Sequence, residues 1–123
     1  ILEQEALTQN HIDGVNKEQA ISYQQFVLDF LLIPYLIGKS YKDHFSSQYL
    51  NNIENMMIYL ATLMDIDGNI PMIGDADDGY VFRFEGRLAH CPYRSLLATG
   101  AVLFDNPLLK SKVKTFDSRS WLL

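Results

Sequence analysis

Five polar side chains between residues 9 and 23 have the chemistry of a proton-transfer or anion-binding site. They are Gln9, His11, Asp13, Glu18 and Tyr23. Asp13 precedes Gly14 in a turn dipeptide, because glycine readily adopts the positive φ that tight turns need. The start of a helix offers free backbone N–H groups that suit an anionic ligand, and a tyrosine there is able to exchange a proton with it. The other interpretation is a capped helix that carries a half-buried tyrosine.

A second group consists of five aspartates in the glycine-rich segment 65–86. They are Asp65, Asp67, Asp75, Asp77 and Asp78. An EF-hand loop that starts at Asp65 needs glycine at its sixth position and glutamate at its twelfth, where this chain has Ile70 and Ala76. The pattern therefore argues against an EF-hand. It leaves open another kind of calcium site, or a turn-rich loop whose aspartates bond their own backbone.

The histidines and the cysteine predict no metal site. His11, His44 and His90 lie far apart in the sequence and lack the spacing of metal ligands. Cys91, the single cysteine, has no partner for an intrachain disulfide, and we interpret it as a small buried residue before a helix.

The composition is that of a folded domain. The chain has 123 residues, of which 48% are hydrophobic and 20% charged, and this excludes a disordered tail or a low-complexity linker. The net charge of −5 argues against nucleic acid, which needs a basic face, and against an anionic membrane surface. The most apolar window, residues 26–37, is too short to span a bilayer, and the N-terminus lacks the pattern of a signal peptide.

Apolar residues at helical spacing predict that these side chains are carried by an all-α fold. The expected helices cover residues 1–10, 17–37, 47–64, 92–104 and 108–113, and a further one starts at Ser120. Residues 80–84 alternate as a short strand does.

Capping residues mark the expected helix ends. Gly38 is a natural C-cap for the second helix, and Pro34 should kink or loosen its last turn. Serine and asparagine are preferred at N-caps, and the candidates are Asn16, Ser46 or Ser47, and Ser118.

Four separated segments of the chain resemble heparinase II/III-like proteins. Residues 9–23 look like the segment of that family in which Asp13-Gly14, Glu18-Gln19 and Tyr23 follow one another. Residues 67–79 resemble the family's next loop, and residues 95–104 and 121–123 are similar to the family's later segments. The resemblance covers nearly the whole chain in order.

The resemblance implies an (α/α) toroid, in which antiparallel helical hairpins form a ring, here with a long Asp/Gly-rich loop. Residues 1–123 would be one partial segment of that toroid, without the family's upstream helices and its downstream β-sandwich region. It implies a polysaccharide lyase that acts on uronic-acid polymers such as glycosaminoglycans or alginate. The chemistry needs no metal or organic cofactor.

Carried over residue by residue, the resemblance implies Tyr23 as the catalytic acid and leaves the role of base open to the same side chain. Glu18, Gln19, His11, Asp13 and Asp75 would bind or orient the substrate. The partners implied are an acidic polysaccharide or oligosaccharide and the remainder of the parent chain. The expected location is the periplasm or outside the cell.

Three departures limit the activity expected of this segment alone. The family's asparagine-rich motif lies upstream of the segment and its later histidine lies downstream, so we expect the isolated chain to be inactive. Gln24 follows Tyr23, where many members carry histidine or glycine. The net charge of −5 repels a polyanion unless a local basic cluster offsets it, and the sequence suggests Arg83, Arg87 and Arg94. Two alternatives stay open: a non-catalytic carbohydrate-binding or scaffold protein of the same fold, and a helical interaction domain.

Overall fold

The computed structural model describes residues 1–76, 79, 81 and 91–123, and within these residues the chain is helical without a strand. This confirms the all-α prediction. The expected strand at 80–84 lies outside the described residues, apart from Val81. The helices are α1 (Leu2–Gln9), α2 (Ile21–Ser40), α3 (Ser47–Leu63), α4 (Pro92–Phe104), α5 (Pro107–Lys112) and the short 3-10 helix η1 (Ser120–Leu122).

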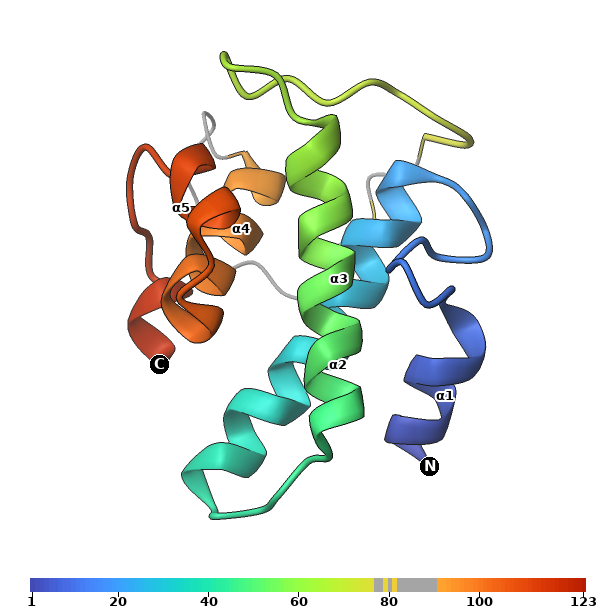
Figure 1. Cartoon of the computed structure of the whole chain (residues 1–123), viewed down its shortest axis with the longest axis vertical. Coiled ribbons are helices and arrows are strands. Elements are labelled where there is room, and N and C mark those ends of the chain that lie inside the picture. Colours follow the sequence, from blue (N-terminus) through green and yellow to red (C-terminus); the bar gives the residue numbers. More distant parts are fainter. Residues whose placement is uncertain (77–78, 80, 82–90) are drawn as a thin grey trace.

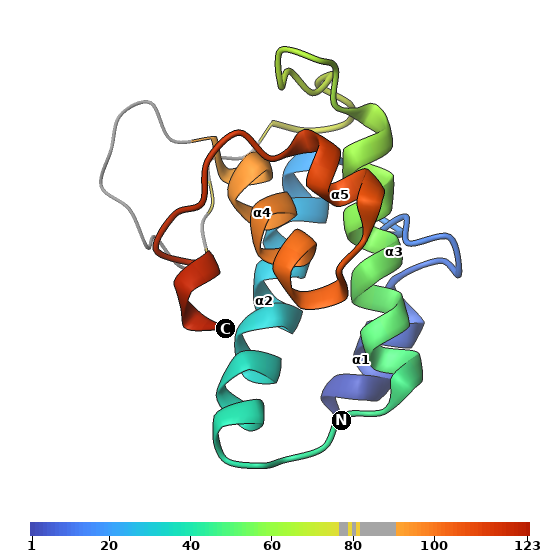
Figure 2. The same cartoon turned by 60° about the vertical axis from the view of Figure 1, so that its left-hand side comes forward.

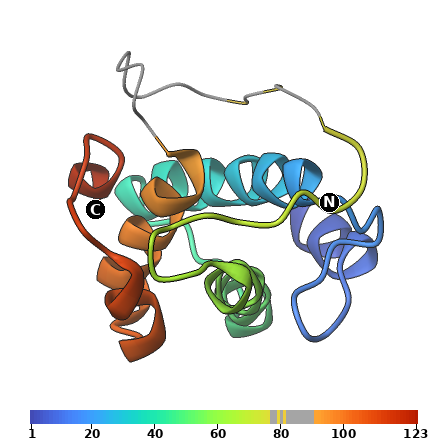
Figure 3. The ribbon, with the colours of Figure 1, turned by 90° about the horizontal axis from the view of Figure 1, so that it is seen from above.

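Helix α3 is the centre of the packing. It runs antiparallel to α2, with α1 on one side and α4 and α5 on the other (Figures 1 and 3). One face of α3 is fully buried, because its apolar residues recur at helical spacing. Its buried apolar side chains are Tyr49, Ile53, Met56, Met57, Leu60 and Ala61.

The start of α3 agrees with the sequence. Ser46 is the N-cap, and its hydroxyl accepts a hydrogen bond from the Tyr49 N–H at 3.2 Å. Burial raises the pKa of the Tyr49 hydroxyl, as does the nearby Glu3 carboxylate. That hydroxyl donates to the Leu31 carbonyl at 2.6 Å, which fastens α3 to α2.

The start of α2 differs from the prediction. Asn16 builds a turn instead of capping a helix: its side-chain oxygen accepts from the Glu18 N–H at 3.0 Å, and its carbonyl accepts from the Gln19 N–H at 2.9 Å. Gln19 then adopts a left-handed φ of 55°, which no helix interior permits. The helix therefore begins at Ile21 rather than at residue 17.

The end of α2 also differs. The helix continues through Pro34 to Ser40, and Gly38 lies inside it. The left-handed residue is Lys42, with φ 62°. The Asp43 N–H bonds the Gly38 carbonyl at 2.9 Å and the Lys42 N–H bonds the Lys39 carbonyl at 3.2 Å, which is the Schellman arrangement.

A polar stripe along α2 is buried in the structure. Ser22, Gln25 and Asp29 are all at most 8% exposed. By length and composition α2 also meets the criterion for a membrane span, as the core helices of soluble proteins do, and 56% of the apolar window is buried against other elements.

The C-terminal third follows the sequence with two corrections. Pro92 opens α4, and Asn106 caps α5 by accepting from the Leu108 N–H at 2.9 Å. Cys91 is half-buried rather than buried. The N-cap of η1 is Arg119, not Ser118. Figure 2 shows η1 beside α4, with which it is in contact.

Candidate functional site

The loop between α1 and α2 is held by the buried side chain of Gln24. Its amide oxygen accepts from the Asn16 N–H at 2.8 Å, and its amide nitrogen donates to the Gly14 carbonyl at 2.6 Å and the Met56 carbonyl at 3.3 Å. Gln24 is 1% exposed. One side chain thus fixes the loop against α2 and α3 together.

Three buried asparagines extend this network. The Asn16 amide donates to Asn10 at 3.1 Å, and the Asn10 amide donates to Asn52 of α3 at 3.4 Å. Gly14 closes the loop with φ 86°, and a side chain there would overlap the Asn55 carbonyl group. A buried polar network whose members are satisfied makes a segment rigid, so the loop is a fixed platform.

A second segment meets the first turn of α2. The Ile21 N–H donates to the Ile73 carbonyl at 3.0 Å, and the Ser22 hydroxyl donates to the Asp75 carbonyl at 2.7 Å. A Cβ on Gly74 would lie 2.7 Å from that of Ala20. Residues 73–75 therefore lie directly on the start of α2, more than 50 residues away in sequence.

The structure brings three of the six predicted site residues to this junction. Along the chain, Gln19 and Tyr23 flank residues 20–22, which contact residues 73–75, and Asp75 is part of that contact. Tyr23 is half-buried, while the side chains of Gln19 and Asp75 are exposed. Within the described part of the chain, no hydrogen bond engages the Tyr23 hydroxyl, so it is available to a ligand.

The other three predicted residues lie on the platform loop itself. Glu18 is exposed and lies in the Asn16 turn. His11 and Asp13 are exposed at the outer end of the loop, where the neighbouring Ile12 carbonyl accepts from Asn55 of α3 at 3.0 Å. Asp13 also accepts from the Val15 N–H at 3.2 Å, so one of its oxygens serves the turn.

The first part of the aspartate-rich segment is a turn that bonds to itself. The Asp65 carboxylate accepts from the Asn69 amide and from the Asn69 N–H, each at 2.8 Å. These hydrogen bonds, the side-chain one first, lower the pKa of Asp65. Among the described residues no three metal-binding side chains gather. Five residues singled out in the sequence lie outside the description: Asp77, Asp78, Arg83, Arg87 and His90.

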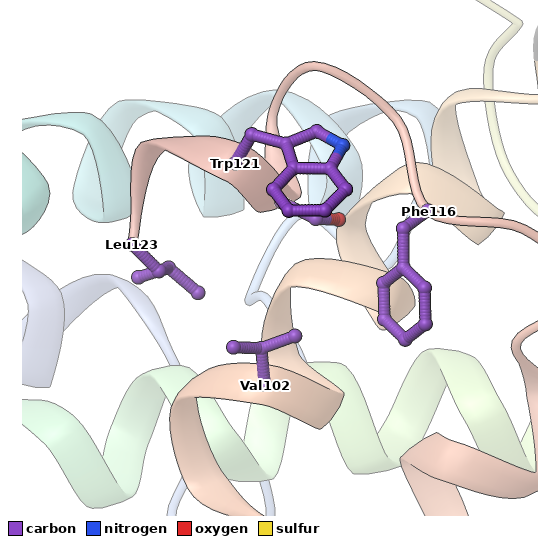
Figure 4. Close-up of a pocket in the computed structure, with 5 residues that line it drawn as sticks. Val102, Phe116, Trp121 and Leu123 are labelled. Carbon is purple, nitrogen blue, oxygen red and sulfur yellow. The ribbon is translucent and has the colours of Figure 1, made fainter.

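Two apolar hollows lie elsewhere on the surface. One has a volume of about 350 Å³ and is formed by Val102, Phe116, Trp121 and Leu123, with Ser120 (Figure 4). Trp121 is 81% exposed there. The other, between α1 and α2, has a volume of about 470 Å³ and includes the exposed side chains of Phe26 and Phe30.

Comparison of the chain with family models, with curated proteins and with solved structures found no match. The likeness to heparinase II/III-like proteins therefore stays a prediction from the sequence motifs. The candidate site is defined by the geometry of the residues alone.

Proposed function

We propose that this chain is a segment of a polysaccharide lyase that cleaves uronic-acid-containing polysaccharide by β-elimination, with Tyr23 as its catalytic acid. The observation that supports this most is the position of Tyr23. Tyr23 is half-buried and follows Ser22, whose hydroxyl donates to the Asp75 carbonyl, and the Tyr23 hydroxyl has no hydrogen-bond partner in the described part of the chain.

β-Elimination requires this hydroxyl to donate a proton to the leaving oxygen. In β-elimination a base removes the proton beside the uronate carboxylate, a carbon–carbon double bond forms, and the glycosidic carbon–oxygen bond breaks. The electron pair goes to the leaving oxygen, which takes a proton from the acid. A tyrosine held within hydrogen-bond reach of that oxygen is suited to this step, and donors nearby stabilise the developing negative charge.

The remaining predicted residues take substrate-binding roles in this proposal. Gln19 and Asp75 at the junction, and Glu18, His11 and Asp13 on the platform loop, would contact the sugar chain. The proposal includes no cofactor. The antiparallel α2–α3 pair is compatible with an arc of an (α/α) toroid, and the exposed Phe26, Phe30 and Ile37 of α2 are where further helices of the parent would pack.

The proposal is tested on the parent protein with a panel of uronate polymers. We propose a periplasmic or secreted location, where such polymers are met. Cleavage by β-elimination creates an unsaturated uronate that absorbs in the ultraviolet, and at least one polymer should yield it. If every polymer is left uncut, the lyase assignment is wrong.

A non-catalytic carbohydrate-binding protein is the second candidate, and Gln24 favours it. Both N–H groups of the Gln24 amide are engaged by the Gly14 and Met56 carbonyls, and its oxygen accepts from the Asn16 N–H, so the amide has no N–H left to donate in a reaction at the neighbouring Tyr23. Binding of oligosaccharide by the parent without any cleavage would select this candidate. A helical interaction domain is the third, and the apolar hollow between α1 and α2 favours it.

A further inference from the structure

A cleft at the turn between α2 and α3 differs in chemistry from the two apolar hollows. It has a volume of about 400 Å³. The turn that carries it, where α2 ends and α3 begins, is at the lower end of the molecule in Figure 1. The residues that line it are Tyr35, Lys39, Lys42, Asp43, His44, Phe45 and Leu50.

The rim of the cleft carries excess positive charge. Lys39 and Lys42 are exposed, and neither forms an ion pair within the residues that the structure describes. Asp43 is the one acidic residue among those that line the cleft. In a chain of net charge −5, two unpaired lysines at one cleft are a local reversal of sign that attracts an anion.

The start of α3 adds little to this field, because the Glu3 carboxylate offsets its partial positive charge. A helix N-terminus carries partial positive charge, and α3 begins two residues after Phe45. It already binds one carboxylate, because the Glu3 side chain accepts from the Ser46 N–H at 2.7 Å. The C-terminal end of α2 carries partial negative charge and repels an anion. The two lysines therefore provide the main attraction for an anion.

The wall of the cleft is aromatic. Phe45 packs edge-on against Tyr35 with ring centroids 5.7 Å apart, and stacks on Tyr49 at 4.8 Å. Gly38 permits this packing, because a Cβ there would lie 2.8 Å from the Phe45 ring. Tyr35, Phe45 and Leu50 stay half-buried, which leaves apolar surface in the lining of the same cleft.

We propose that this cleft binds the oxyanion group of an acidic sugar unit, with Lys39 and Lys42 on the carboxylate or sulfate and the Tyr35–Phe45 wall against the sugar ring. The electron-rich face of an aromatic ring suits the C–H face of a sugar, and lysine suits an oxyanion. The choice of a sugar rests on the proposed function. The cleft is a separate subsite, since Lys39 lies 16 residues from Tyr23 along α2, about 24 Å at the helical rise.

A substitution at Lys42 distinguishes a role of this side chain in binding from an effect on the stability of the fold. Lys42 occupies the left-handed position of the Schellman arrangement, where glycine is the residue of lowest strain. Lys42→Gly should therefore raise the Tm by roughly 4–8 °C while it weakens binding. A residue with a purely structural role would not show opposite effects.

The test is calorimetric titration of the full chain with four probes. They are a uronate tetrasaccharide, a tetrasaccharide of neutral sugars that carries sulfate groups, a tetrasaccharide of neutral sugars without sulfate, and an acidic peptide with the same charge as the anionic sugars. We expect binding of one or both anionic sugars, weakened roughly tenfold in the Lys39→Gln/Lys42→Gln variant. Lys110→Gln/Lys114→Gln removes the same amount of charge elsewhere on the surface and is the control for the lysine variant. Asp105→Gly also replaces a left-handed residue at a helix end by glycine, and it is the control for Lys42→Gly.

The outcomes separate the two proposals. Carboxylate-only or sulfate-only binding identifies which oxyanion the cleft takes. Equal binding of the neutral sugar, stronger binding of the peptide, no binding at all, or equal loss in the control pair would each overturn the assignment. Lysine-dependent binding by a parent that cuts no polymer would leave this inference standing and remove the lyase function.

Discussion

Arg119 donates a hydrogen bond to the Asp29 carboxylate across 90 residues of sequence, and both side chains are buried. The second Asp29 oxygen accepts from the Gln25 amide at 3.0 Å. The pair joins the middle of α2 to the residue that precedes η1, so the C-terminal segment is fastened to the helix that carries Tyr23. Breaking one side of a buried pair leaves a charge without its main partner, which is costly.

Asp29→Ala should lower the free energy of unfolding by about 3–5 kcal/mol, measured by urea denaturation. The control is Lys110→Ala, which removes the partner of Asp105 in an exposed pair and should cost at most about 1 kcal/mol. Asp29→Leu/Arg119→Met should be less destabilised than Asp29→Ala. Equal effects of Asp29→Ala and Lys110→Ala would show that the buried pair contributes no more than an exposed one.

Gln24→Ala should release the platform loop. The change leaves the buried Asn16 N–H and Gly14 carbonyl without their partner, at about 1–3 kcal/mol for each group. The hydrogen-exchange rate of the Asn16 N–H should increase as the free energy of unfolding decreases. The exposed Gln48→Ala on α3 is the matched control, and unchanged exchange in the Gln24 variant would contradict the network.

Gly14→Ala and Gly68→Ala should differ in cost although both glycines have a positive φ. At Gly14 the new methyl group meets the α3 backbone at Asn55, whereas at Gly68 it meets the guanidinium end of the half-buried Arg94 side chain, which is flexible. We expect about 1–2 kcal/mol for Gly68→Ala and about 3–5 kcal/mol for Gly14→Ala. Thermal unfolding of both variants measures this, and a larger loss for Gly68→Ala would refute the close packing of the loop on α3.

The turn after α3 should weaken in acid. The pKa of Asp65 lies below its ordinary value in the folded chain because Asn69 bonds its carboxylate. The carboxylate therefore stabilises the turn above the unfolded pKa of about 4, and this contribution is lost as the pH falls through the lower folded pKa. The Asn69 amide resonance, followed by NMR, should shift over this acid range and lose its pH dependence in Asp65→Asn.

Much of the fold was predictable from local sequence signals. Ser46 and Pro92 mark helix starts because their effects act within one turn, and the apolar spacing of α3 reports its buried face. The start of α2 was not predictable, because Asn16 has the side chain of a cap but its turn is fixed by Gln24, eight residues later.

The candidate site was predictable in part. Tyr23 and Gln19 are close in sequence, so their placement on either side of the start of α2 is a local feature. The contact between Ser22 and Asp75, and the lysines at the far end of α2, depend on how distant segments pack. Lys42 gives no signal in the sequence, because a lysine at a left-handed position breaks the glycine pattern that identifies a helix end.

The role of Tyr23 as catalytic acid is tested most sharply by the turnover of Tyr23→Phe in the parent protein, on a uronate polymer that the parent cleaves. The change removes only the hydroxyl, and Tyr41→Phe, an exposed tyrosine on the turn after α2, is the matched control. We expect kcat to fall at least about hundredfold with unchanged Tm, while the control keeps full activity. Full turnover by a folded Tyr23→Phe variant would show that Tyr23 is not the acid.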